Sequence, residues 1–145
     1  MHRRPLGGGR TLAAIGSILI VVGSVLPWWR VGGTSGIPFA GGNAFEGSGI
    51  IVFLVGVATL ALVALPYAVG DRPTGLDRTV SFGLLAVVGW LGFAWRVVDL
   101  LLSGAFKFTE PAQVFTNGPG LWLAALGLAI LSRSVYRMTR EPIYR

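Results

Sequence analysis

The sequence contains no cysteine, a single histidine and a single lysine. The lack of cysteine excludes disulfides, thiolate metal sites and thiol nucleophiles. His2 and Lys107 complete neither a His–carboxylate metal cluster, nor a Ser–His pair, nor a P-loop. We therefore expect a protein that is not an enzyme and that holds neither a metal nor a cofactor.

Charge is scarce as well, at 12% of the residues against about a quarter in a soluble domain. Hydrophobic residues make up 53%, and the mean hydropathy is +0.71. They gather in four stretches, residues 11–29, 48–69, 79–103 and 119–135. Each stretch approaches the ~20 residues that a helix needs to cross ~30 Å of hydrocarbon. The sequence predicts an all-α membrane protein, a four-helix transmembrane bundle that occupies residues 1–145 as one domain.

The basic residues are distributed unevenly around these stretches. Nine lie before the first stretch, between the second and third, or from the end of the fourth onward, whereas the opposite side has only Arg30 and Lys107. The positive-inside rule then places both termini in the cytoplasm. We expect the net charge of +6 to serve orientation and contact with anionic lipids at the cytoplasmic face, with no role in nucleic-acid binding.

Aromatic residues mark the expected outer ends of two stretches. Trp28 and Trp29 end the first stretch, and Trp122 opens the fourth. Because tryptophan favours the headgroup zone, we expect these three rings to act as interface anchors.

Six glycines repeat at a spacing of seven residues within the first, second and fourth stretches. They are Gly16, Gly23, Gly49, Gly56, Gly120 and Gly127. A seven-residue step returns to nearly the same helix face, so each of these helices carries a seam of small residues that permits close packing. The seams predict a left-handed bundle with crossing angles near +20°. They close either within one monomer or, for one seam, on a partner.

Local signals predict two smaller features. Residues 28–31 and 37–40 flank a Gly-Gly-Thr-Ser-Gly turn, which is typical of a small β-hairpin in the first outer loop. Asp77 directly precedes the third stretch, where its carboxylate is placed to cap the helix.

Arg96 and Asp99 are charged residues inside the third stretch. They are three residues apart and share a helix face. About 26 Å of helix separates Thr79 from Arg96, which puts the guanidinium near the outer edge of the hydrocarbon. There it reaches the headgroups or pairs with an acidic residue of an outer loop, Glu46 or Glu110.

A structural ion pair is the interpretation that we favour for Arg96 and Asp99. The alternative is a ligand site at the outer half of the third span, completed by Trp90 and Trp95, because charges inside a membrane often mark functional sites.

Two short motifs add a family resemblance. The first stretch ends in Leu-Pro-Trp-Trp, and the last opens with Gly-Pro-Gly-Leu-Trp-Leu. Together with the glycine-rich loop, they resemble a diffuse class of small four-span proteins of actinobacteria and related high-GC bacteria, mostly of unknown function. The arrangement also resembles the claudin architecture, although the claudin cysteine pair is missing. The resemblance implies a protein of the bacterial cytoplasmic membrane and no activity.

Two functions fit these observations. The first is a non-catalytic subunit or assembly partner of a larger membrane protein complex. The second is a small-molecule or lipid carrier with an outer-leaflet cavity around the third span. Carriers usually show broken helices or polar midplane residues. Since Pro66 is the single candidate break and the midplane is apolar, we favour the first function.

Overall fold

The computed structural model describes residues 7–31, 40–69, 77–103 and 118–140. Its four helices are α1 (Gly8–Val25), α2 (Ile50–Val69), α3 (Arg78–Leu102) and α5 (Pro119–Arg140). All four are long and apolar enough to cross a membrane, which confirms the predicted class of multi-pass helical protein. Residues 104–117, and with them the predicted role of Glu110, lie outside the described residues.

The helix ends follow local chemistry. α1 stops at Val25, four residues earlier than predicted, because Leu26 precedes Pro27 and takes an extended conformation. Asp77 accepts hydrogen bonds from the N–H groups of Thr79 and Val80, at 3.0 and 3.4 Å, so the predicted cap of α3 is confirmed. α5 begins with a proline at its first position and continues five residues beyond the predicted end, to Arg140.

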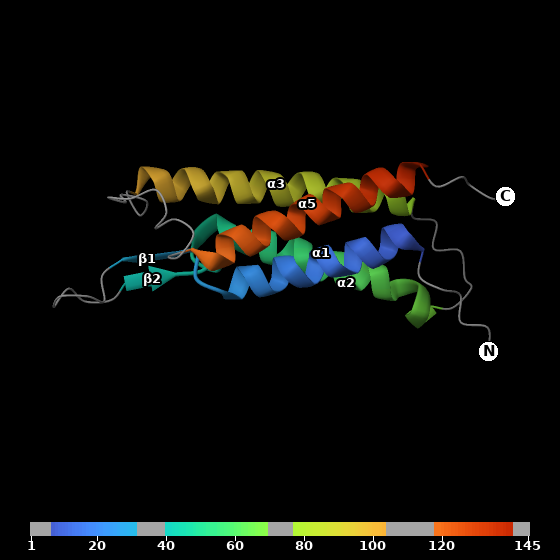
Figure 1. Ribbon diagram of the computed structural model, residues 1–145, viewed down its shortest axis with the longest axis horizontal. Coiled ribbons are helices and arrows are strands. Elements are labelled where there is room, and N and C mark those ends of the chain that lie inside the picture. Colours follow the sequence, from blue (N-terminus) through green and yellow to red (C-terminus); the bar gives the residue numbers. More distant parts are fainter. Residues whose placement is uncertain (1–6, 32–39, 70–76, 104–117, 141–145) are drawn as a thin grey trace.

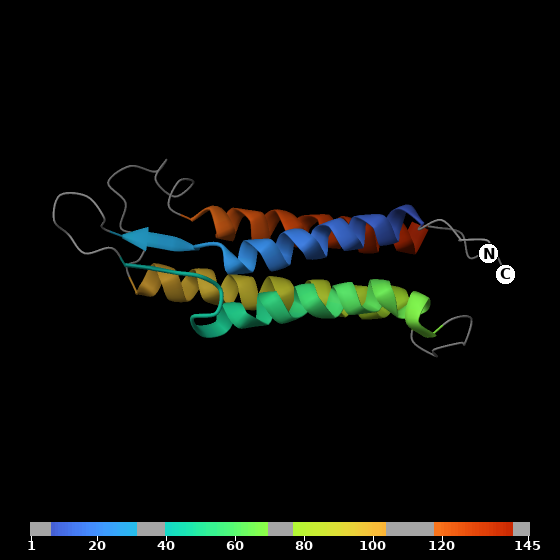
Figure 2. The same cartoon turned by 90° about the horizontal axis from the view of Figure 1, so that it is seen from below.

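The four helices run antiparallel to their chain neighbours and form a bundle of two layers, α1 with α5 and α2 with α3 (Figures 1 and 2). α1 packs most extensively against α5, and α2 and α3 complete the ring. The start of α1, the end of α2, the start of α3 and the end of α5 share one end, here called the terminal end. The opposite end is called the hairpin end. The left-handed twist of the bundle stays a prediction.

The glycine seams of α1 and α5 lie directly against each other. A Cβ on Gly16 would sit 2.8 Å from the carbonyl oxygen of Gly127, and a Cβ on Gly23 would sit 2.8 Å from that of Gly120. The same antiparallel register, continued by seven residues, brings Gly9 level with Ser134, and both are buried. Because backbone meets backbone here, only residues without a Cβ fit at the four inner positions.

The other seam glycines receive side chains or loop backbone. Gly56 of α2 accommodates Ile20 and Val21 of α1. Gly49 lies in the 3-10 turn η1 (Gly47–Gly49), where it makes room for the backbone of Ala44, so it belongs to the loop that precedes α2.

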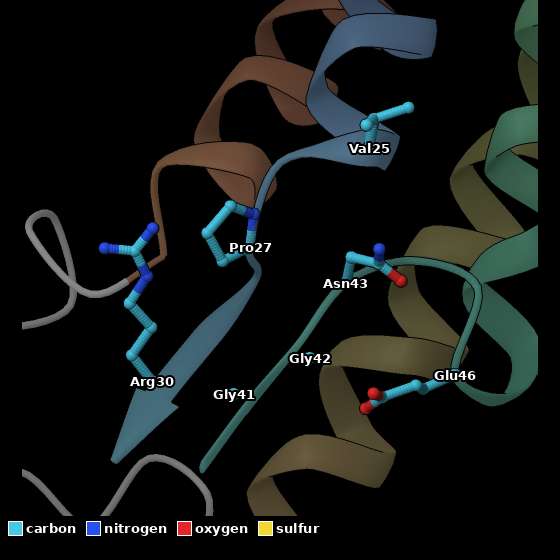
Figure 3. Close-up of a pocket in the computed structure, with 7 residues that line it drawn as sticks. All are labelled: Val25, Pro27, Arg30, Gly41, Gly42, Asn43 and Glu46. Atoms are coloured by element: carbon cyan, nitrogen blue, oxygen red, sulfur yellow. The ribbon is translucent and has the colours of Figure 1, made fainter. Parts of the chain in front are cut away.

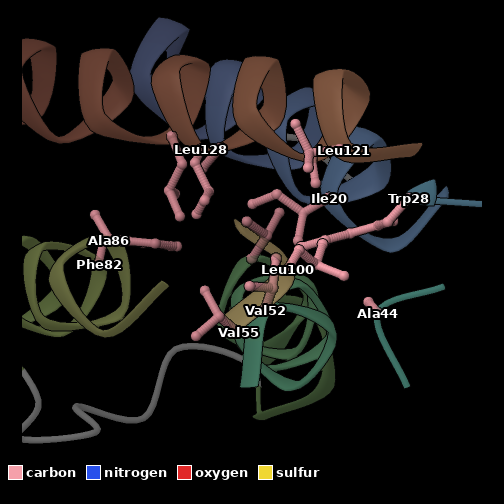
Figure 4. Close-up of a cluster of buried hydrophobic side chains, with 14 residues drawn as sticks. Ile20, Trp28, Ala44, Val52, Val55, Phe82, Ala86, Leu100, Leu121 and Leu128 are labelled. Carbon is pink, nitrogen blue, oxygen red and sulfur yellow. The ribbon is translucent and has the colours of Figure 1, made fainter. Parts of the chain in front are cut away.

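The core between the layers is apolar and comes from every helix (Figure 4). Its large, fully buried members include Ile20, Val52, Phe82 and Leu128. Three buried hydroxyls satisfy their hydrogen bonds within their own helices; Ser17, Ser24 and Thr59 donate to carbonyl oxygens at 2.7–2.8 Å. Such local bonding lets a hydroxyl lie at an apolar contact without a partner from another helix.

The predicted hairpin is present. β1 (Trp29–Val31) pairs antiparallel with β2 (Ala40–Gly42), which extends two residues beyond the predicted end at Ala40; the rest of the predicted second strand, residues 37–39, lies outside the described residues. Two hydrogen bonds tie the hairpin to the end of α1: Trp28 N–H donates to the Gly42 oxygen at 2.8 Å, and Ala44 N–H donates to the Ser24 oxygen at 3.2 Å. These two hydrogen bonds fix which residues of β1 and β2 lie opposite each other.

Candidate functional site

The charged residue predicted inside α3 lies at the hairpin end and is buried by protein. The Arg96 residue is only 6% exposed. Its Nη1 lies 2.6 Å from the Asp99 Oδ2, one helical turn away, and its Nη2 lies 3.9 Å from the Glu46 Oε2. The sequence left two geometries open: the guanidinium either extends to the headgroups or pairs with a carboxylate of an outer loop. In the structure it pairs with the loop carboxylate of Glu46.

Gly47 allows the loop to close over that guanidinium. It has φ of +85°, and a Cβ added there would lie 3.0 Å from the Arg96 Nη1. Any other residue would meet both an unfavourable backbone conformation and the guanidinium. The sequence offered no separate signal for Gly47, because it is one glycine among 22.

Glu46 also approaches the hairpin. A Cβ on Gly42 would clash with the Glu46 carboxylate and would lie 2.6 Å from the Trp29 Nε1. The absence of a side chain at Gly42 therefore lets a carboxylate and an indole edge share this space. Glu46 thus lies between β1 on one side and α3 on the other.

Several buried hydrogen-bonding atoms at this end have no protein partner. They are Trp29 Nε1, Ser48 Oγ and Arg96 Nε. Burying a polar group without a partner costs about 1–3 kcal/mol. We name Trp29, Glu46, Ser48, Arg96 and Asp99 the rim cluster; it joins a buried guanidinium to two carboxylates that are about half exposed.

The three expected interface anchors occupy three different environments. Trp28 is fully buried, its Nε1 donates to the Gly23 oxygen at 2.8 Å, and its ring packs 5.5 Å from that of Phe93. Since an anchor exposes its ring to headgroups, Trp28 is a core residue, and the early end of α1 explains why. Trp29 is half-buried, and Trp122 is exposed at the first turn of α5, as an anchor requires.

The side chains of the alternative ligand site diverge. Trp95 is 72% exposed on the outside of α3, whereas Arg96, the next residue, points into the protein. Trp90 donates from Nε1 to the hydroxyl of Ser132 on α5 at 3.0 Å and packs edge-on against Phe93. The four residues therefore do not line one common cavity.

An open depression of about 270 Å³ lies beside the rim cluster (Figure 3). Its lining comes from the end of α1, both strands and the turn before α2: Val25, Pro27, Arg30, Gly41, Gly42, Asn43 and Glu46. Sequence reasoning treated Arg30 only as a loop charge and missed this role. The hairpin register creates the depression, since it sets Arg30 opposite Gly41.

Basic side chains gather at the terminal end. Arg133, Arg137 and Arg140 of α5 are exposed, and the Arg140 guanidinium stacks over the Tyr136 ring at 4.6 Å. A Cβ on Gly8 would lie 3.9 Å from the Arg137 Nη1, so Arg137 reaches the start of α1. The combined surface suits anionic headgroups.

Within residues 7–31, 40–69, 77–103 and 118–140, no three His, Cys, Asp or Glu side chains come together as a metal site would need. Searches of protein-family models, curated proteins and solved structures returned no match to this chain.

Proposed function

We propose that this protein is a non-catalytic integral subunit, or an assembly and stabilising partner, of a larger membrane protein complex. We further propose that it resides in the bacterial cytoplasmic membrane with both termini in the cytoplasm. The first proposal rests on a row of exposed aliphatic side chains along α3. It is supported by the packing of the glycine seams, which is completed by helices of the same chain.

The row on α3 consists of residues whose spacing alternates between four and three. They are Val80, Leu84, Val87, Leu91, Ala94, Val98 and Leu101. The large side chains in this row are each more than half exposed. A repeat of seven keeps the row on one side of the helix, as packing against a partner helix requires, and the row runs along nearly the whole of α3.

The glycine seams do not supply the partner surface. The seams of α1 and α5 close on each other, and Gly56, Gly89 and Gly92 receive side chains from neighbouring helices of the same chain. For these glycines the contacts lie within the monomer, which supports the first of the two interpretations of the seams. A partner would instead meet the exposed face of α3.

A site-specific cross-linking experiment tests this function. A photoreactive amino acid at Leu91 on α3 is compared in living cells with the same residue at Val22, which is exposed on α1. We expect the α3 position to capture a distinct membrane protein and the α1 position to capture lipid. If both positions capture only lipid, the proposed subunit role is contradicted.

Alanine variants add a second arm to the same experiment. Replacing Leu84 and Leu91 together keeps α3 apolar but removes two side chains that would interlock with a partner. The matched control replaces Ile18 and Val22 on α1. We expect only the α3 variant to lose the co-purifying protein, while both unfold at the same temperature.

The terminal end supports contact with anionic lipid as a further part of this proposal. The antiparallel register of α1 and α5 sets Arg10 level with Arg133, and Arg137 and Arg140 follow on the next two turns of α5. Each basic residue near an anionic surface contributes about 1 kcal/mol to membrane attraction.

A further inference from the structure

The depression at the hairpin end has charges of both signs on its walls. Arg30 and Glu46 extend from opposite sides of the two strands, and Asn43 directly follows β2 (Figure 3). Arg30 forms no ion pair with any residue in the described parts of the chain. Glu46 approaches a cation only at 3.9 Å, which is too long for a hydrogen bond. The Arg30 guanidinium and the solvent-exposed part of the Glu46 carboxylate are therefore accessible to a ligand that carries both an anion and a cation.

An apolar track leads into this depression from the membrane-spanning part. The track consists of exposed α1 side chains spaced three or four residues apart, Ile15, Ile18, Val22 and Val25. Val25 also lines the depression. The track is ~15 Å long at 1.5 Å per residue, which is about half of a ~30 Å hydrocarbon core and thus one leaflet.

We propose that the depression and the track together bind one phospholipid whose headgroup carries a phosphate and a primary ammonium, as in phosphatidylethanolamine. Arg30 binds the phosphate, Glu46 accepts hydrogen bonds from the ammonium, and Asn43 donates to a phosphate or ester oxygen. The acyl chains lie along Ile18 and Val22 on α1. This inference does not depend on the proposed role in a complex.

The chemistry of the two walls selects among headgroups. A glycerol headgroup has no cation, so the carboxylate of Glu46 repels a lipid whose net charge is negative. A choline headgroup is cationic but has no N–H to donate. A primary ammonium has three N–H donors and makes charge-assisted hydrogen bonds to a carboxylate. A phosphatidylethanolamine headgroup therefore matches both charged residues, with its phosphate on Arg30 and its ammonium on Glu46.

Competition between lipids tests the proposal. The purified full-length protein in detergent receives equimolar phosphatidylethanolamine, phosphatidylglycerol and phosphatidylcholine with identical acyl chains, and native mass spectrometry counts the retained lipids. We expect about tenfold preference for phosphatidylethanolamine, the value of one hydrogen bond to a charged group. Equal retention of the three lipids would overturn the proposal.

Two charge variants separate the walls. Glu46→Gln should abolish the preference among headgroups, because the ammonium loses its carboxylate. Arg30→Gln should lower retention of all three lipids alike, because every headgroup has a phosphate. Thr139→Ala, at an exposed position near the opposite end of the bundle, is the control and should leave retention of all three lipids unchanged. Retained preference in the Glu46 variant would overturn the assignment.

Because Glu46→Gln also changes the contact with Arg96, a third variant blocks the depression by steric bulk alone. Gly41→Leu fills the depression without a change of charge, at an exposed position whose φ is not positive. We expect it to unfold at the temperature of the unsubstituted protein and to retain several-fold less phosphatidylethanolamine. A folded Gly41→Leu protein that retains this lipid fully would refute the site.

Discussion

Replacing Gly127 with alanine places a methyl group inside the contact between the backbones of α1 and α5. The added carbon would lie 2.7 Å from the carbonyl oxygen of Gly16 and 2.7 Å from the backbone nitrogen of Ile20. Favourable carbon contacts begin near ~3.5 Å, so α1 and α5 must separate by about 1 Å. Neither neighbour has a rotamer to change, because both are backbone atoms.

The magnitude follows from two opposing terms. Overpacking costs about 3 kcal/mol, at the upper end of the usual range, since the whole helix must move. Alanine returns about 1 kcal/mol through its better helix propensity. We expect a net loss of about 2 kcal/mol, or roughly thirtyfold in the ratio of folded to unfolded protein.

Gly83→Ala is the matched control on α3. There the added Cβ would lie 3.7 Å from the Val135 Cγ1, an ordinary van der Waals distance. This variant should gain up to about 1 kcal/mol from helix propensity alone. Unfolding in mixed micelles, titrated with sodium dodecyl sulfate and followed by circular dichroism, measures both. Equal midpoints for Gly127→Ala and Gly83→Ala would refute the account of the seam.

Three further changes probe the hairpin end, each measured by the same unfolding titration. Arg96→Leu leaves the carboxylates of Glu46 and Asp99 without their cation. Since both are about half exposed to solvent, we expect the free energy of unfolding to fall by about 1–2 kcal/mol. An unchanged midpoint would contradict the structural role of the pair. Gly47→Ala forces a side chain into positive φ and against the guanidinium, for an expected loss of about 1–3 kcal/mol; a stabilised variant would argue against that conformation. Trp28→Phe removes the hydrogen bond to the Gly23 oxygen and part of a fully buried ring, so it should cost about 1–3 kcal/mol, whereas an interface anchor would tolerate the change.

The candidate site was only partly accessible from the sequence. The Arg96–Asp99 pair follows from a spacing of three in one helix, and Glu46 was one of two carboxylates expected to reach it. The burial of Arg96 and the position of Gly47 were not accessible, because both depend on how the loop folds back over α3. Trp28 was assigned to the interface because Pro27 was not recognised as ending the helix early.

The sequence by itself determined the class of this protein, the number of spans and the spacing of the α1 and α5 seams. These properties depend on hydrophobic length and on helical periodicity, which are local and can be read along the chain. Tertiary structure alone decided that the two seams face each other, that the second strand extends to Gly42, and that Arg30 and Glu46 share one depression. Each of these depends on contacts between segments far apart in the chain, where the packing of backbone against backbone selects one register among several that the sequence permits.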